Sequence, residues 1–158
     1  MPQPLPISAS VDVAAPVDAV WSVVSDVTRM PEWSPELRRL YVLGRREPRV
    51  GLRLLGINRR GYAVWPTTSK VTRFEPGRAV AWRTRESGAT WTYELEAVEG
   101  GTRLTGRRDL PEFTLGTTLM APLIGGADRH DRELADGIRA TLERIKATVE
   151  STSTAATR

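Results

Sequence analysis

The stretch "TWTYELEAVEGGTRLTGRR" (residues 90–108) contains the clearest β-hairpin signal in the chain. Its first half alternates aromatic and aliphatic side chains with threonine and glutamate, which is the two-residue period of a strand with one buried face. The "EGG" at residues 99–101 is a glycine-rich turn of the kind that joins two antiparallel strands. The rings therefore face a core, and the glutamates face water.

Strand composition continues on the N-terminal side of this hairpin, interrupted by turn signals such as "NRRG", "EPGR" and "ESG". Consecutive strands without intervening helices favour an antiparallel meander. The sequence predicts about seven strands, near residues 7–13, 38–43, 50–57, 62–74, 79–85, 89–98 and 102–109.

Two short elements are expected between the first two strands. "AAPVDAVWSVVSD" (residues 14–26) has Pro16 at its start and valines at helical spacing, which predicts a short amphipathic helix ending near Asp26. "PEWSPEL" (residues 31–37) is the second short element, because its two prolines prevent a longer helix.

The last quarter of the chain carries the clearest helix signal. Leu134, Ile138, Leu142, Ile145 and Val149 recur at intervals of four, four, three and four residues. The helix would be about 35 Å long at 1.5 Å per residue. A long helix with one apolar stripe needs a sheet face to cover it, and a strongly curved sheet would leave space beneath it.

Composition excludes several classes of function. The chain has 158 residues, no cysteine and one histidine, so disulfides and thiol catalysis are excluded and a metal site is not expected. No apolar run approaches the roughly 18 residues of a membrane span. The N-terminus lacks the basic and apolar regions of a secretory signal, so the cytoplasm is the expected compartment. We expect one domain over residues 7–150, with residues 1–6 and 151–158 disordered.

Net charge and pI are high, at +4 and about 10.1. Basicity of this kind raises a nucleic-acid or anionic-surface interpretation. The arginines are scattered among 19 acidic residues, however, and no run of five like charges occurs. Binding to nucleic acid is therefore the least favoured hypothesis.

The order of elements resembles the START-like, helix-grip (SRPBCC) superfamily, and within it the polyketide cyclase/dehydrase-like group, over residues 7–149. The segments that carry the resemblance are "APVDAVWSVVSDVTRMPEWSPEL", "GLRLLGINRRGYAVWPTTSKVTRFEPGRAVAW", "WTYELEAVEGGTRLTG", "APLIGG" and the closing helix. The resemblance implies an α+β fold in which a curved antiparallel sheet wraps around the C-terminal helix and encloses a cavity. Members bind lipids, sterols or polyketides, and some catalyse aromatisation or cyclisation. No catalytic motif is common to the group.

Strand alternation places an unusual set of side chains on the inner face of the expected sheet. Large rings share this face with gaps at Gly56 and Gly106 and with hydroxyls at Thr67 and Ser69. Apolar walls with a few convergent polar groups are typical of a small-molecule pocket. The alternative is that the rings fill the space and the polar groups lie at a wet rim. The residues expected to contact a ligand are Trp33, Leu54, Asn58, Trp65, Trp82, Trp91, Tyr93, Leu104, Arg108, His130 and Leu134.

Each candidate for chemistry has a structural alternative. Trp33 would either form a wall at the pocket edge or anchor its short helix on the core. Tyr93, Arg108 and His130 could move a proton or hold a ligand oxygen. Equally, the tyrosine and Asn58 could be satisfied locally, the arginine could pair with an acid at the rim, and the histidine could lie half-exposed in the first helical turn.

Three functions remain open. The preferred one is a carrier or sensor of a small hydrophobic molecule such as a lipid or polyketide, as a monomer or homodimer and without a cofactor. The second is a polyketide aromatase/cyclase or dehydratase that uses the same cavity, because a cyclase needs a folding surface and one acid or base. The third is a binder of nucleic acid or an anionic surface.

Overall fold

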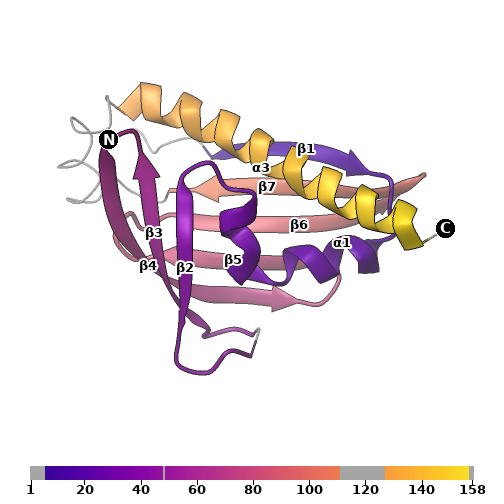
Figure 1. Ribbon diagram of the computed structural model, residues 1–158, viewed down its shortest axis with the longest axis horizontal. Coiled ribbons are helices and arrows are strands. Elements are labelled where there is room, and N and C mark those ends of the chain that lie inside the picture. The colour runs from indigo at the N-terminus through magenta and orange to yellow at the C-terminus, as the bar shows by residue number, and fades with distance from the viewer. Residues whose placement is uncertain (1–5, 48, 111–126, 157–158) are drawn as a thin grey trace.

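The structure is a computed structural model in which residues 6–47, 49–110 and 127–156 are described. Its strands form one seven-stranded sheet in the order β1-β7-β6-β5-β4-β3-β2, with every neighbouring pair antiparallel (Figure 1). The strands are β1 (Ile7–Val13), β2 (Leu37–Leu43), β3 (Arg53–Arg60), β4 (Ala63–Glu75), β5 (Ala79–Thr84), β6 (Thr90–Val98) and β7 (Gly101–Asp109). The predicted fold class and the predicted meander are confirmed.

Pro66 lies inside β4, where it pairs with Ile57 of β3. A proline is tolerated there because β5 pairs with β4 only from Ser69 onward, which leaves this part of β4 as a local edge. Register shifts occur elsewhere, near Arg38 in β2 and near Thr72 in β4.

The two short elements after β1 are α1 (Val17–Val24) and the 3-10 helix η1 (Val27–Glu32). The second element therefore begins earlier than the predicted residues 31–37. Its start is set by Asp26, whose carboxylate accepts a hydrogen bond from the Thr28 amide at 3.2 Å. Pro31 falls inside η1, and Trp33 closes it through a bond from its amide to the Met30 carbonyl.

The C-terminal helix α3 (Ala127–Ala156) crosses one face of the sheet and contacts β1, β7 and α1 (Figure 1). It extends to Ala156, so residues 151–156 are helical rather than disordered. In this last stretch the hydroxyls of Thr152 and Thr154 donate to the carbonyls of Thr148 and Glu150, so each threonine satisfies its hydroxyl within the helix.

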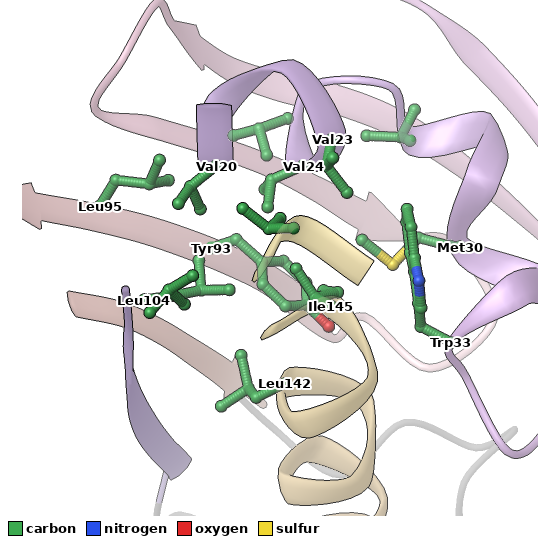
Figure 2. Packing of buried hydrophobic residues seen from close by; sticks show 14 of the residues in the cluster. Val20, Val23, Val24, Met30, Trp33, Tyr93, Leu95, Leu104, Leu142 and Ile145 are labelled. Carbon is green, nitrogen blue, oxygen red and sulfur yellow. The ribbon is translucent and has the colours of Figure 1, made fainter. Parts of the chain in front are cut away.

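The apolar core lies between the sheet and the C-terminal half of α3 (Figure 2). The side chains of Leu142 and Ile145 are wholly buried there, together with Leu104 of β7 and Val20 of α1. Gly106 permits the close approach of α3, because a Cβ at that position would lie 3.1 Å from Cγ2 of Ile138. The core therefore fills one end of the layer beneath α3 and leaves the other end to the site.

Candidate ligand-binding cavity

A cavity of about 490 Å³ lies beneath the N-terminal half of α3. It is lined by side chains from β3–β7 below, by Met30 and residues 34–38 at one side, and by one face of the helix above. Eight of the eleven residues expected to contact a ligand line it: Leu54, Asn58, Trp65, Trp82, Trp91, Tyr93, Arg108 and Leu134. The inner-face alternation predicted for β3–β7 therefore describes the cavity floor well, and the rings do not fill the space.

Aromatic rings form the floor of the cavity. Trp82 of β5 is in register with Trp91 of β6, and its ring lies 5.6 Å from that of Tyr93 with an angle of 18° between the planes. Trp65 of β4 lies opposite Asn58 of β3. Neighbouring strands thus present a broad, flat apolar surface on which a planar molecule can stack.

A row of polar groups crosses the same floor. The Asn58 amide donates to the Thr67 hydroxyl at 3.0 Å, and the hydroxyls of Ser69 and Thr84 lie 3.1 Å apart. All four side chains line the cavity. Each of them is already bonded within the protein, so the local satisfaction expected as the alternative for Asn58 is present. The hydroxyls nevertheless retain lone pairs for a ligand, because a hydroxyl oxygen accepts two hydrogen bonds.

Tyr93 differs from this row. Its side chain is 4% exposed, and burial raises its pKa. The phenol therefore stays protonated and is a hydrogen-bond donor at physiological pH. Within the part of the chain that the structure describes, no partner for this hydroxyl is present. A ligand carbonyl or hydroxyl can accept its proton.

Four charged side chains gather at one end of the cavity, which we call the charged end: Glu36, Arg60, Arg108 and Glu133. Arg108 is 7% exposed, and its guanidinium lies over the Trp91 ring, 5.8 Å from the centroid. Arg60 forms an ion pair with Glu133 of α3. Burial raises the pKa of Glu36, and the charges of Arg60 and Arg108 oppose this rise. A carboxyl of this kind can exchange a proton nearer neutrality than an exposed one.

Glu36 is a site residue that was not predicted from the sequence. It precedes β2 and follows Pro35, so no strand or helix period places its side chain. Glu133, Gly137 and Thr141 of α3 also line the cavity, although none of them belongs to the predicted apolar stripe. Their spacing of four residues was the signal that could have found them, because it repeats the interval of the neighbouring apolar stripe.

Two expected ligand contacts, Trp33 and Leu104, do not line the cavity, and the third remaining one, His130, is not tested. Trp33 is 2% exposed and belongs to the core, where its indole donates to the Thr148 hydroxyl at 3.2 Å. It is therefore the anchor of its short helix and not a wall of the pocket. Leu104 is fully buried in the core, because it precedes Gly106 and Arg108 on β7 and therefore lies nearer the β6–β7 hairpin, away from the cavity. His130 lies in α3, but its side chain is outside the described residues.

Neither a metal centre nor a membrane span is found in what the structure describes. Among the described side chains, no three histidine, aspartate or glutamate residues gather as metal ligands would. None of the described helices is long and apolar enough to cross a membrane.

Residues 5–150 match the family described as "Polyketide cyclase / dehydrase and lipid transport". The chain belongs to this family. The Polyketide_cyc-like protein Cgl2372 from Corynebacterium glutamicum is 33% identical, with a TM-score of 0.61 over 95% of this chain and 94% of that one. No curated protein matches the chain at a significant level.

Two aromatase/cyclases of lower identity share the fold of this family member. The Zhui aromatase/cyclase from Streptomyces sp. R1128 is 18% identical, with a TM-score of 0.69 over 92% of this chain and 93% of that one. The di-domain ARO/CYC StfQ from the steffimycin biosynthetic pathway is 17% identical, with a TM-score of 0.74 over 94% of this chain. The chain spans about half of StfQ, or 51% of its length. These likenesses show the helix-grip fold.

Proposed function

We propose that the protein is a carrier or sensor that holds a small hydrophobic molecule, such as a lipid or polyketide, in the cavity beneath α3. The observation that carries the proposal is the cavity itself: about 490 Å³ lined by four large rings. This volume is within the usual range for small-molecule sites, roughly 300–1,000 Å³. The family to which the chain belongs supports a ligand-binding or polyketide cyclase role.

The chemistry of the lining favours a flat, oxygenated ligand over a plain alkyl chain. The stacked pair of Trp82 and Tyr93 offers a planar apolar face. The Tyr93 hydroxyl and the row that includes Ser69 and Thr84 offer hydrogen bonds beside that face. An alkyl chain would leave these polar groups without any added partner, whereas a polyketide carries carbonyls along its length.

A second function, aromatase/cyclase or dehydratase chemistry, is favoured by the charged end. Cyclisation by carbon–carbon bond formation requires a base that removes a proton from the carbon beside a carbonyl, and a donor that stabilises the oxygen of the carbonyl under attack. Glu36, Arg108 and Tyr93 all line the cavity, so Glu36 would act as the base and the guanidinium of Arg108 and the phenol of Tyr93 would act as donors. The names of the two aromatase/cyclases of similar fold support this second candidate.

Native mass spectrometry of the purified protein, followed by organic extraction, tests the first function. We expect a stoichiometric co-purifying apolar molecule, or a thermal shift with planar polyphenols that exceeds the shift with fatty acids of similar size. Tyr93→Phe should weaken binding of an oxygenated ligand, whereas Tyr41→Phe, a matched change on the exposed outer face, should not. An apo protein that responds to neither ligand class would contradict the proposal.

Turnover separates the two functions. A short poly-β-ketone thioester should be cyclised faster with the protein than without it if the second function holds. Glu36→Gln and Tyr93→Phe should then slow the reaction while Tyr41→Phe leaves it unchanged. If Glu36→Gln, Tyr93→Phe and Arg108→Gln all retain full turnover, the cavity is not the catalytic site.

A further inference from the structure

The cavity opens beside the turn between β3 and β4. Among its lining residues, Pro35, Arg38, Arg59 and Gly61 are exposed, so they mark the rim. The Arg59 amide donates to the Glu36 carbonyl at 2.9 Å and joins the two sides of this rim. Figure 1 shows the turn at the end of the molecule opposite the C-terminus.

The turn and the start of β4 project apolar side chains into water. Tyr62 is completely exposed, and the side chain of Val64 is 60% exposed. The turn itself is well defined: Gly61 adopts a positive φ of 58°, and the Arg59 guanidinium donates to its carbonyl at 3.1 Å. Tyr62 thus lies on an ordered turn beside the cavity opening, and its side chain packs against no other part of the described fold.

The rim carries an excess of positive charge. Arg38 and Arg59 are exposed there, and in the described part of the chain neither of them forms an ion pair with an acidic side chain. Arg60 is already paired with Glu133. The rim thus combines the guanidinium groups of Arg38 and Arg59 with an exposed aromatic ring and an exposed aliphatic side chain.

We propose that the β3–β4 turn docks the cavity opening onto an anionic lipid bilayer. Arginines near a bilayer are attracted by anionic headgroups, and tyrosine is favoured at the level of the headgroups because its ring is apolar and its hydroxyl is polar. Val64 adds apolar area that leaves water on insertion. Docking would let an apolar ligand pass between bilayer and cavity without crossing water.

Other occupants fit the rim less well. A second copy of the chain, placed symmetrically, would bring the same arginines together. A nucleic-acid backbone would pair with the arginines but leave Val64 in water. Only the purpose of docking rests on the proposed function, because vesicle binding can be measured whether or not the cavity holds a ligand.

Co-sedimentation with vesicles of phosphatidylcholine, with and without phosphatidylglycerol, tests the proposal on the full chain. We expect binding to the anionic vesicles only. Each of Arg38→Gln and Arg59→Gln should lower the partition coefficient about fivefold. The double variant Tyr62→Ser/Val64→Thr should lower it on the order of tenfold, because it removes the inserted apolar area. Its melting temperature should stay near that of the wild type, since both side chains are exposed.

The matched control is Val50→Thr, because Val50 is 57% exposed but precedes β3, at the opposite end of that strand from the turn. It should bind vesicles as the wild type does. A second control is Arg53→Gln/Lys70→Gln/Arg83→Gln, which removes three exposed cations that lie in register across the outer face of β3, β4 and β5. Loss of binding in this triple variant but not in the turn variant would overturn the proposal.

Three further outcomes would also overturn it: equal binding to neutral vesicles, no vesicle binding, and binding to duplex DNA that is unaffected by Tyr62→Ser. Failure of vesicle docking can be distinguished from failure of the proposed carrier function. If vesicles bind but no ligand enters the cavity, docking stands and the carrier function falls. If a ligand binds but vesicles do not, the reverse holds. Tyr62 and Val64 do not line the cavity, so ligand affinity without vesicles should be unchanged in the turn variant.

Discussion

The rings of Trp82 and Tyr93 lie nearly parallel, although the two residues are not register partners. Tyr93 pairs across the sheet with Val80, and Trp82 pairs with Trp91, so the stacked rings are diagonal neighbours on adjacent strands. Diagonal neighbours come within reach of each other when their side chains are long. The stack gives the cavity a floor that the sheet holds in place without a ligand.

The hydroxyl of Tyr93 should contribute little to folding. Tyr93→Phe is expected to change the free energy of unfolding by less than about 1 kcal/mol, because the removed group has no hydrogen-bond partner in the described part of the protein. Tyr93→Ala should cost about 3–5 kcal/mol, because the ring is buried between sheet and helix (Figure 2). Urea denaturation measures both. Similar losses for the two variants would mean that the hydroxyl has a structural partner.

Two glycines on opposite sides of the helix–sheet interface should respond to alanine with opposite signs. A Cβ on Gly106 would lie 3.1 Å from Cγ2 of Ile138 and 3.3 Å from Cε1 of Tyr93, which crowds α3 away from the sheet. Gly106→Ala should therefore destabilise by about 1–3 kcal/mol. Gly137→Ala should stabilise by up to about 1 kcal/mol, because alanine favours the helix and its Cβ would lie 3.4 Å from Pro35. Thermal melts of both variants check the signs, and stabilisation by Gly106→Ala would show that the interface is loosely packed.

Stability should depend on pH through Glu36. Burial raises its pKa above the usual value of 4.5, so the folded protein holds this proton to higher pH than the unfolded chain does. The stability that the neutral carboxyl contributes is therefore complete below 4.5 and is lost as the pH rises through the raised pKa. Glu36→Gln should remove that loss, so the free energy of unfolding of the variant should rise relative to that of the wild type as the pH rises above 4.5.

Glu150 is the control for this pH dependence, because its pKa is shifted in the opposite direction. Its carboxylate accepts a hydrogen bond from the Ala14 amide and another from Lys146, and both lower its pKa. The stability that the Glu150 carboxylate contributes is present above the usual pKa of a carboxyl and is lost as the pH falls. The free energy of unfolding of Glu150→Gln should therefore fall relative to that of the wild type as the pH rises. Drifts of the same sign in the two variants would contradict the assignment for Glu36.

Much of the architecture could be predicted because apolar residues recur with the two-residue period of strands and with the period of three or four residues of helices. The two-residue alternation in β3–β7 holds along the cavity floor, since the register shift of β4 falls after Val71, beyond the residues that line the site. The interval of three or four residues placed Leu134 and Ile138 on the inner face of α3. The alternation continues to Ala97, which shares the face of Leu95 but is exposed because it lies near the end of β6.

The residues that could not be predicted lie where no period applies. Glu36 sits in the connection between η1 and β2, and its place at the charged end depends on a backbone bond from Arg59 of a strand that comes later in the chain. Trp33 offered two readings that differ only in how η1 is oriented. Asp26 caps the start of η1 through bonds from Thr28, but contacts with α3 hold Trp33, so the choice between wall and anchor required the structure.

The anchoring of Trp33 should depend on the hydroxyl of Thr148. The indole N–H donates to this hydroxyl at 3.2 Å, and the hydroxyl in turn donates to the Arg144 carbonyl at 2.9 Å. Thr148→Val keeps the shape of the side chain but leaves a buried N–H without its acceptor, which should cost about 1–3 kcal/mol. Thr152→Val is the matched control one turn later, because its hydroxyl also donates to the helix carbonyl four residues earlier but is exposed. Its cost should be within about 0.5 kcal/mol.

A double-mutant cycle between Trp33→Phe and Thr148→Val shows whether this bond carries the effect. Phenylalanine has no N–H, so in the Trp33→Phe background the threonine substitution should cost clearly less than in the wild type. Denaturant midpoints of the four proteins give the coupling free energy. A coupling near zero would mean that the Thr148→Val loss arises within α3 itself, through the bond to Arg144, and that the indole is held by apolar packing alone. A coupling of about 1 kcal/mol or more would instead assign the attachment of the residues 27–33 to α3 in part to this one hydrogen bond.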